Sequence, residues 1–447
     1  MATTQASKTG GAASGAAGTL EIRDSRTGKS YPISIMEPAT EGDTAIRAMD
    51  LRQIKVDTDE FGLMTYDPAF MNTASCKSAI TFIDGEKGIL RYRGYPIEQL
   101  AENATFLEVA WLLRHGELPT QPEYDRWVHD ITFHTYVHEN IKEFISGFRY
   151  NAHPMSMLTA TVAALSSFYP EAKNIHDPDQ RNISIVRLLA KVPTLAAFSY
   201  RHAKGLPFIY PDNDLSFVEN FLSMVARMSE PKYECNPIFC KALEVLFILH
   251  ADHEQNCSTN AVRAVGSSHV DPFSAVAAGI AALYGPLHGG ANEQVMGMLK
   301  QIGSVEKAES FVLDALNNKQ KVMGFGHRVY RTTDPRAPIL RDLSARLTEQ
   351  GGKTQWLDIS NRVVEVMRRE MDARGKRIYP NVDFFSASVY YTIGIATDLF
   401  TNIFAMARAA GWTAHVIEQY ANNRLIRPEA EYKGPFGRKV APIGQRR

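Results

Sequence analysis

Residues 236–256 read NPIFCKALEVLFILHADHEQN, and this stretch is the clearest helix in the sequence. Asn236 is a residue type that caps helices, and Pro237 is well tolerated in a first turn. Apolar residues then recur every three or four positions, and His250 and His253 continue the same spacing. The pattern predicts one helix over residues 236–256 with two histidines on its apolar face.

Helical segments of similar length recur from about residue 96 to the end, separated by clusters of proline, glycine and asparagine. Strands do not alternate with these helices, which argues against a parallel sheet. A short alternating pattern over residues 20–58 predicts a small β region. A hairpin is predicted from two arms, 79–83 and 88–93, around Asp84-Gly85. The sequence therefore predicts a mainly α protein with a small N-terminal β region.

Composition excludes several classes of function. The 447 residues are 45% hydrophobic, enough for the cores of two or three domains. Lys+Arg and Asp+Glu both number 49, so no charge excess favours nucleic acid or an anionic membrane. The longest runs without charge fall short of the roughly 18 apolar residues that span a bilayer. We expect a protein with neither nucleic-acid nor membrane partners.

The ends of the chain and its cysteines predict a cytoplasmic location. The first eighteen residues resemble a disordered tail, without the arginines of a transit peptide or the apolar core of a secretory signal. The last three residues, Gln445-Arg446-Arg447, are not a peroxisomal address. The four cysteines show no paired framework, which is typical of a reducing compartment.

A second stretch, KVMGFGHRVYRTTDPRAP over residues 321–338, carries candidate chemistry. His327 follows two glycines, where bare backbone can approach a ligand, and three arginines follow within nine positions. This combination suits an anionic ligand and proton transfer. The alternative is an ordinary turn with solvated arginines. A dinucleotide fingerprint is excluded, because Val329 occupies the place of the third glycine.

The other candidate histidines have several interpretations. Three interpretations fit His250 and His253. The first is that they are core histidines, and the second is that they bind a metal with Asp252 or Glu254 nearby. The third is that they belong to a polar ligand site at the end of the helix. His288 lies on a glycine-rich turn before a helix, whose positive N-terminus disfavours imidazolium and so favours a neutral hydrogen-bond donor. A surface turn histidine is the alternative.

Asp383 stands before a long apolar helix, and two interpretations fit it. An aspartate in that place is commonly an N-cap. A carboxylate surrounded by apolar residues is also a candidate general base. Two further cations, Arg408 and Arg427, follow downstream.

Taken in order, these segments resemble the citrate synthase family. The matching motifs are YRGYPI (92–97), HADHE (250–254), GPLHGG (285–290), GFGHRVYRTTDPR (324–336) and NVDF (381–384). The resemblance covers the chain from about residue 20 to Arg427, and the β region resembles that of the bacterial, typically hexameric branch.

The resemblance implies a helical enzyme of two domains that close over the substrates. The implied division is a tail (1–18), a β region (19–60), a large helical domain (61–289 with 391–447) and a small helical domain (290–390). The functional unit is a homodimer, in a chain expected to form a homohexamer.

The implied activity is acyl transfer, in which acetyl-CoA, oxaloacetate and water give citrate and CoA without a metal or another cofactor. Catalysis falls to Asp383 as base on acetyl-CoA, His288 on the thioester oxygen and His327 on the oxaloacetate carbonyl. Oxaloacetate is held by His253, Arg336, Arg408 and Arg427. CoA is contacted by Arg331 at a phosphate and by Val322, Met323, Gly324, Phe325 and Gly326 around the adenine.

Three alternatives stay open at this point. Bacterial members usually have tyrosine and glycine where this chain has Phe385 and Ala387, which leaves 2-methylcitrate synthase, acting on propionyl-CoA, as the alternative activity. A non-catalytic helical scaffold would have lost a catalytic group, and none is missing. A metallohydrolase would need metal at His250 and His253.

Overall fold

The computed structural model describes residues 16–37, 44–349 and 355–446, and the chain divides into two compact units, Met1–Lys77 and Ser78–Arg447. The first unit holds an antiparallel sheet in the order β1-β2-β3, with one short 3₁₀ helix after it. Its elements are β1 (Ala16–Arg23), β2 (Ser30–Met36), β3 (Ala45–Ile46) and η1 (Ala48–Gln53). The predicted β region is therefore confirmed. β1 begins inside the segment predicted as a tail, and residues 1–15 lie outside the described residues.

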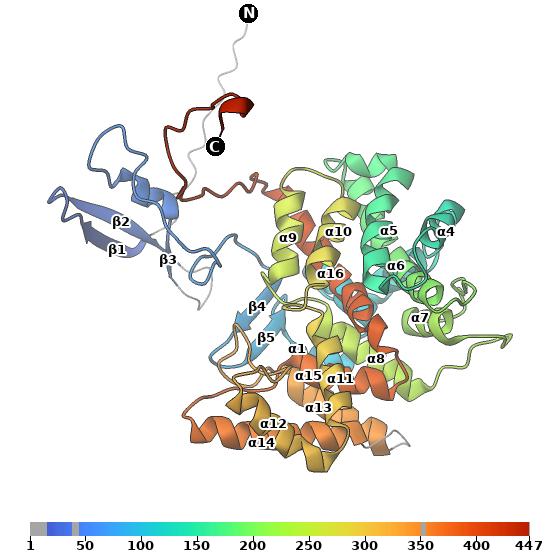
Figure 1. The fold of residues 1–447 in the computed structure, drawn as a ribbon. Coiled ribbons are helices and arrows are strands. Elements are labelled where there is room, and N and C mark those ends of the chain that lie inside the picture. The colour runs from blue at the N-terminus through green and yellow to red at the C-terminus, as the bar shows by residue number, and fades with distance from the viewer. Residues whose placement is uncertain (1–15, 38–43, 350–354, 447) are drawn as a thin grey trace, which may run out of the picture. The chain divides into compact units, whose positions relative to one another are not determined.

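The second unit begins with the predicted hairpin and is otherwise helical (Figure 1). The hairpin strands are β4 (Thr81–Asp84) and β5 (Ile89–Tyr92), extended by β6 (Tyr95–Pro96). The α-helices are α1 (Ile97–Asn103), α2 (Phe106–His115), α3 (Gln121–Thr132), α4 (Glu139–Ser146), α5 (Pro154–Phe168), α6 (Pro178–Ala203), α7 (Phe217–Ala226), α8 (Pro237–His250), α9 (Cys257–Gly266), α10 (Pro272–Leu283), α11 (Ala291–Ile302), α12 (Val305–Asn317), α13 (Arg336–Glu349), α14 (Gln355–Ala373), α15 (Val382–Thr392) and α16 (Phe400–Ala421). Short 3₁₀ helices are η2 (Pro170–Lys173), η3 (Thr397–Leu399) and η4 (Ile443–Gln445). The mainly α prediction is confirmed.

Helix α16 lies at the centre of the helical unit (Figure 1) and packs against α2, α6, α8, α9 and α10. Residues 400–416 of this helix are all buried, as expected for a helix that is apolar on every side. The stretch also holds two titratable residues, Arg408 and His415, and both are almost fully buried. Buried charged and titratable groups need partners, so these two residues mark the helix as more than a packing element.

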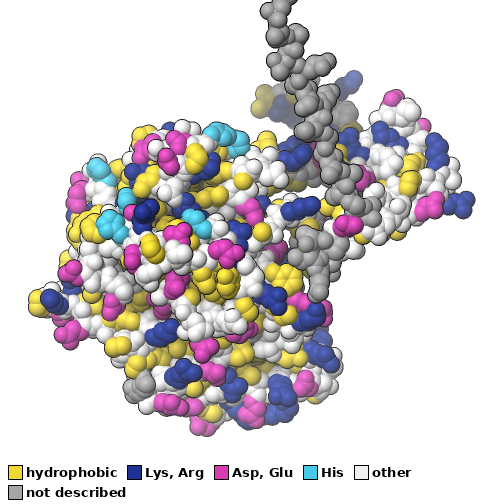
Figure 2. Space-filling view, turned by 180° about the vertical axis from the view of Figure 1, so that it is seen from behind, with side chains coloured by type: hydrophobic (Ala, Val, Ile, Leu, Met, Phe, Trp, Pro, Cys, Tyr) yellow, Lys and Arg dark blue, Asp and Glu magenta, His cyan; other side chains and the backbone are white. Residues whose placement is uncertain are grey.

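Helix α6 is long and apolar enough to cross a membrane by length and composition. Within the structure, however, 83% of its apolar window is buried inside the protein, which is how a core helix behaves. On the face shown in Figure 2, acidic and basic side chains are interspersed, in keeping with the balanced composition.

The helix predicted over residues 236–256 is shorter than expected. Asn236 caps it as predicted, but α8 ends at His250, and α9 begins at Cys257. The Tyr92 hydroxyl contacts the carbonyl oxygens of Ile248 (3.3 Å) and Asp252 (2.8 Å), and the Asn256 side chain caps α9. These tertiary contacts override the helical periodicity, so His253 lies in a loop (251–256) and not on a helix face.

The cysteine interpretation also needs correction. Cys235 and Cys240, on either side of the first turn of α8, form a disulfide. Their separation of five residues is not a common motif, so this pair could not be recognised from cysteine spacing.

Candidate active site

Five segments that are distant in sequence form the candidate site. They are the loop 251–256 after α8, the turn 285–290 before α11, the stretch 321–336 that ends at the first residue of α13, the start of α15 and the middle of α16. These segments supply His253, His288, His327, Asp383, Arg336 and Arg408 to one region of the second unit.

The first catalytic candidate, His327, has a fixed tautomer. Its Nδ1 accepts the backbone N–H groups of Val329 (3.0 Å) and Tyr330 (3.1 Å). Because a backbone amide only donates, Nδ1 carries no proton, and the ring proton lies on Nε2. Burial, with the Arg336 charge nearby, lowers the pKa of His327 to about 4. The ring is therefore a neutral donor at physiological pH.

The second catalytic candidate, His288, is held in the opposite tautomer. Its Nε2 lies 3.3 Å from the backbone nitrogen of Ser258 and 2.9 Å from the Ser258 hydroxyl. The backbone N–H requires a bare Nε2, so Nδ1 carries the proton. Burial, assisted by the charge of Arg408, lowers the pKa of His288 to about 4. Burial, and not the helix N-terminus considered from the sequence, is the main cause that lowers this pKa.

The carboxylate of Asp383 is not an N-cap. Asn381 caps α15 by accepting the Asp383 N–H at 3.1 Å, and Asp383 lies inside the first turn. Its Oδ1 is buried and has no hydrogen-bond partner among the described residues. Burial raises the pKa of Asp383 to about 7, although the charges of Arg336 and Arg408 oppose the shift. Such a carboxylate is matched to proton abstraction near neutral pH.

The cationic side of the site contains two buried arginines with different pairing. Arg336 holds Asp334 through Nε (3.0 Å) and Nη2 (2.8 Å), so its charge is balanced within the chain. Arg408 donates Nε to the His250 carbonyl oxygen at 2.7 Å, while its Nη1 has no partner in the described part of the chain. Burial lowers the pKa of Arg408 to about 10. The carboxylates of Asp252 and Asp383 act on this charge from nearby, but none of the described carboxylates forms an ion pair with it, so the guanidinium favours a bound anion.

The loop histidine His253 lies close to His327, with ring centroids 5.3 Å apart. The hydroxyl of Tyr330 lies 3.3 Å from His253 Nε2, and the Tyr330 ring is close to both histidine rings, with centroid distances of 5.6 Å to His253 and 4.6 Å to His327. Burial and the charge of Arg336 hold the pKa of His253 well below its usual value, so this ring too is neutral.

The glycines before His327 have a structural role. Gly324 and Gly326 both have positive φ angles, +79° and +84°. A Cβ at Gly324 would lie 2.9 Å from the Phe384 side chain. Asn381 N–H donates to the Gly324 carbonyl at 2.9 Å. Close approach to α15, beside Asp383, thus explains Gly324, where the sequence suggested approach to a ligand.

Arg331 lies beside a cavity of about 520 Å³. His327 and Tyr330 also line this cavity. Two further lining residues, Arg377 and Glu86, were not expected from the sequence. The remaining lining residues are Gly326, Thr332, Asp334, Ile378, Tyr379 and Pro380. Val322 is buried, and Met323 and Phe325 are half-buried.

One predicted residue is separate from the others. The side chain of Arg427 is 69% exposed and forms an ion pair with Glu429 of the same chain. Nothing in the described residues joins it to the groups above.

Two further residues of this region, Ser258 and Tyr330, were not expected from the sequence. Ser258 gives no sequence signal, because its contact with His288 joins the start of α9 to the turn before α11. Tyr330 lies inside the glycine-rich stretch and its phenol was a visible candidate. As for metals, residues 16–37, 44–349 and 355–446 contain no cluster of three His, Cys, Asp or Glu side chains suited to an ion.

Comparison with known proteins identifies the family. The model of the "Citrate synthase, C-terminal domain" family matches residues 69–429. A peroxisomal citrate synthase of Dictyostelium discoideum is 46% identical over 96% of this chain and 88% of its own length. The chain belongs to the citrate synthase family. The enzyme is accordingly an acyltransferase that forms citrate and CoA from acetyl-CoA, oxaloacetate and water.

Other relatives agree on the activity. A glyoxysomal citrate synthase of Cucurbita maxima is 40% identical over 96% of this chain and 84% of its own length. The Thermotoga maritima enzyme superposes with a TM-score of 0.75 at 35% identity, over 86% of this chain and 99% of that one. The Thermoplasma acidophilum enzyme was solved as a ternary complex with carboxymethyl coenzyme A and oxaloacetate. It superposes with a TM-score of 0.78 at 32% identity, over 84% of this chain and 98% of that one.

These relatives settle two expectations. The alternative activity of a 2-methylcitrate synthase is not favoured, because the curated relatives are citrate synthases. The predicted cytoplasmic location is contradicted, because one relative is peroxisomal and another glyoxysomal.

Proposed function

We propose that three groups share the chemistry of this citrate synthase: Asp383 as base, His288 as donor to the thioester, and His327 as donor to oxaloacetate. The observation that carries the proposal is the pairing of an unpartnered carboxylate, with a pKa of about 7, with two neutral histidines of opposite tautomer. This is an acid–base set ready to act on a methyl group and two carbonyl groups.

The first step moves one proton and stabilises one oxygen. Asp383 removes a proton from the methyl group of acetyl-CoA, and its carboxylate becomes neutral. The electron pair passes to the thioester oxygen, where His288 Nδ1–H donates a hydrogen bond. Hydrogen-bond donors of this kind each contribute about 10²- to 10³-fold to the rate.

In the second step the enol carbon attacks the ketone carbon of oxaloacetate. The ketone oxygen takes up the proton of His327 Nε2 as the carbon–carbon bond forms, which gives citryl-CoA. Water then attacks the thioester carbonyl and gives a proton back to His327 Nε2, while the C–S bond breaks and the sulfur leaves with the proton held by Asp383. Citrate and CoA are released, and both groups return to their starting states. These donors polarise both carbonyl groups, so the proposal includes neither a metal nor a cofactor. Activity lost on dialysis against EDTA would contradict that part.

Oxaloacetate is the anion that the site needs. Its two carboxylates suit planar arginine forks, and Arg408 is a buried cation with Nη1 unpartnered. We assign the other contacts to His253 and Arg336, and the CoA phosphates to Arg331, with residues 322–326 around the adenine. Arg377, beside Arg331 in the cavity, adds a second cation for phosphate.

The test of these roles is a CoA-release assay with oxaloacetate, comparing acetyl-CoA with propionyl-CoA for the native enzyme and Asp383→Asn. We expect acetyl-CoA to be the better substrate and the variant to lose turnover with both. A variant that retains turnover would show that Asp383 is not the base.

We also infer that the functional unit is a homodimer, in which Arg427 binds the oxaloacetate of the partner subunit. We infer further that these dimers form the hexamer of the bacterial branch. The reaction would then be the entry step of the tricarboxylic acid cycle. Support comes from the exposure of Arg427, which in one chain is separate from the other site residues. Asp383→Asn and Arg427→Ala subunits, mixed under exchange, should regain activity, because one site of each mixed dimer then carries neither defect. No recovery despite exchange, verified by mass, would place Arg427 in its own subunit's site. Sedimentation tests the hexamer.

A further inference from the structure

One face of α16 holds the loop that carries His253. Four residues of this helix, spaced as one helical face, contact the segment from His250 to Ser258. The contacts are Arg408 Nε to the His250 oxygen (2.7 Å), Gly411 N–H to the Ala251 oxygen (3.0 Å), Trp412 Nε1 to Ser258 Oγ (3.2 Å) and His415 Nε2 to Asp252 Oδ2 (3.2 Å).

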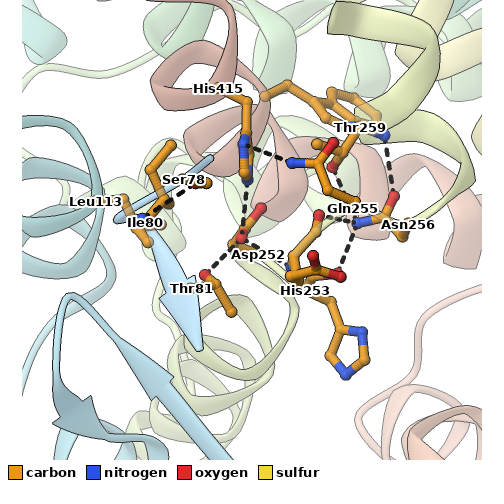
Figure 3. Close-up of polar contacts among 12 residues, drawn as sticks. Ser78, Ile80, Thr81, Leu113, Asp252, His253, Gln255, Asn256, Thr259 and His415 are labelled. Carbon is orange, nitrogen blue, oxygen red and sulfur yellow. Dashed lines mark hydrogen bonds and ion pairs between the residues drawn. The ribbon is translucent and has the colours of Figure 1, made fainter. Parts of the chain in front are cut away.

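The proton of His415 is placed by its neighbours. Its Nδ1 lies 3.3 Å from Arg263 Nη1 and 3.5 Å from Gln255 Nε2, as Figure 3 shows for the glutamine. A guanidinium only donates, so Nδ1 is the acceptor and the ring proton lies on Nε2. His415 therefore donates to the carboxylate of Asp252.

Asp252 is fully buried, and its carboxylate is fixed from several sides. Oδ2 also accepts the Thr81 hydroxyl at 2.6 Å and the backbone N–H of Glu254 at 3.1 Å. Oδ1 faces α16 at Gly411, where a Cβ would lie 2.2 Å from it. The carboxylate thus joins strand β4, the loop and α16 at one point.

The residue after His253 needs this support. Glu254 has a φ of +51°, a left-handed conformation that costs a residue with a Cβ about 1–2 kcal/mol. In Figure 3 the ring of His253 points away from the contacts around Asp252. The backbone of the loop therefore fixes the position from which the His253 side chain extends, and Asp252 holds that backbone. The Tyr330 hydroxyl then contacts the ring, 3.3 Å from Nε2.

We propose that His415 and Asp252 are a positioning pair, which holds the loop 251–256 in the conformation that presents His253 to oxaloacetate. Neither residue touches the substrate. The inference rests on the proposed role of His253 and adds two residues on which that role depends.

Two variants of His415 test the pair. His415→Phe keeps an aromatic ring and removes the hydrogen bonds to Asp252, Arg263 and Gln255. We expect KM for oxaloacetate to rise about tenfold with kcat changed less than threefold. His415→Gln restores an N–H donor toward Asp252, and we expect KM for oxaloacetate to return to within about threefold of the native value. A merely structural histidine would not give this separation of KM from kcat with rescue.

The matched control is Thr413→Val on the same helix. Thr413 is also buried, but among the described residues its hydroxyl donates only to the carbonyl oxygen of Ala410 in its own helix, at 2.9 Å. We expect this variant to leave KM for oxaloacetate unchanged. Thr81→Val is a milder test from the other side of Asp252, with an expected threefold rise in KM, and it decides the question if His415→Phe does not fold.

Two outcomes overturn the proposal: KM for oxaloacetate unchanged in Thr81→Val and His415→Phe, or equally raised in His415→Phe and His415→Gln. His253→Ala separates this failure from that of the proposed function. If His253→Ala raises KM and the His415 variants do not, the positioning pair alone is wrong. If His253→Ala has no effect on KM, the role of His253 itself is wrong.

Discussion

The loops that carry His253 and His327 are held by different means. Loop 251–256 is fixed by side chains from β4 and α16, which lie more than 150 residues away on both sides in sequence. The loop around His327 is fixed mainly by backbone, through two glycines and the segment 379–381. Even the tautomer of His327 is set by the amides two and three residues later.

The difference shows which residues of a site can be recognised from a short stretch of sequence. A histidine held by its own neighbours is visible in a short motif. A histidine held by distant side chains is hidden, because each contact depends on the tertiary fold. The two loops should also respond differently to substitution, through backbone changes in one case and side-chain changes in the other.

The largest expected effect concerns the carboxylate that both histidine loops serve. Asp383→Asn keeps the size of the side chain and removes the base, so we expect kcat to fall about 10²- to 10⁴-fold. Isothermal titration should show oxaloacetate binding within a few-fold of native. Weak oxaloacetate binding would mean that the substitution disturbs both loops and not only the chemistry.

The backbone-held loop should be sensitive to one methyl group. In Gly324→Ala the new Cβ would sit on a residue with positive φ and would lie 2.9 Å from the Phe384 side chain. Because backbone strain and the steric clash add, we expect the free energy of unfolding to fall by about 3 kcal/mol. Gly375→Ala is the control, because it has a positive φ (+63°) but open space around it, so only about 1 kcal/mol is expected. Equal losses in denaturant melts would show that contact with α15 does not hold the loop.

The pH profile tests whether the base and the histidines titrate apart. The pKa of Asp383 is about 7, and only the ionised carboxylate can accept a proton. We therefore expect kcat/KM to fall tenfold for each pH unit below about 7. The pKa values of His288 and His327 are both about 4, so these two rings stay neutral over most of that pH range. An acid limb near 4 would mean that Asp383 is not buried as described, and the Asp383→Asn profile should lack the limb at 7.

The smallest effect is expected where the two loops meet. Tyr330→Phe removes the hydroxyl that lies 3.3 Å from His253 Nε2. One such hydrogen bond is worth about 1 kcal/mol, so KM for oxaloacetate should rise about fivefold with kcat nearly constant. Steady-state kinetics with oxaloacetate as the varied substrate decide it, and a large loss of kcat would place Tyr330 in the chemistry itself.

Much of the fold was predictable because its signals are local. The N-cap Asn236, the hairpin at Asp84-Gly85 and the recurring helices all appear as expected. The end of α8 was not predictable, since helical periodicity continues through His253. The fold ends the helix earlier, through Tyr92 and Asp252, and neither contact leaves a trace in the pattern.

The candidate site shows the same division. His327 and His288 were found from glycine-rich turns, and Asp383 from its position before an apolar helix. Ser258 and His415 were missed, because their importance lies in what they touch across 30 and 163 residues. Resemblance to a family supplied the roles that spacing alone left open.

The bare backbone at Gly411 has a consequence for protein engineering. Exchanging a helical glycine for alanine is a common route to a more heat-resistant enzyme and gains about 1 kcal/mol at a typical site. In the middle of α16 the same exchange would place a methyl group 2.2 Å from a buried carboxylate oxygen. A stabilisation programme guided by helix propensity would choose this position early, and there it would damage the enzyme it was meant to strengthen.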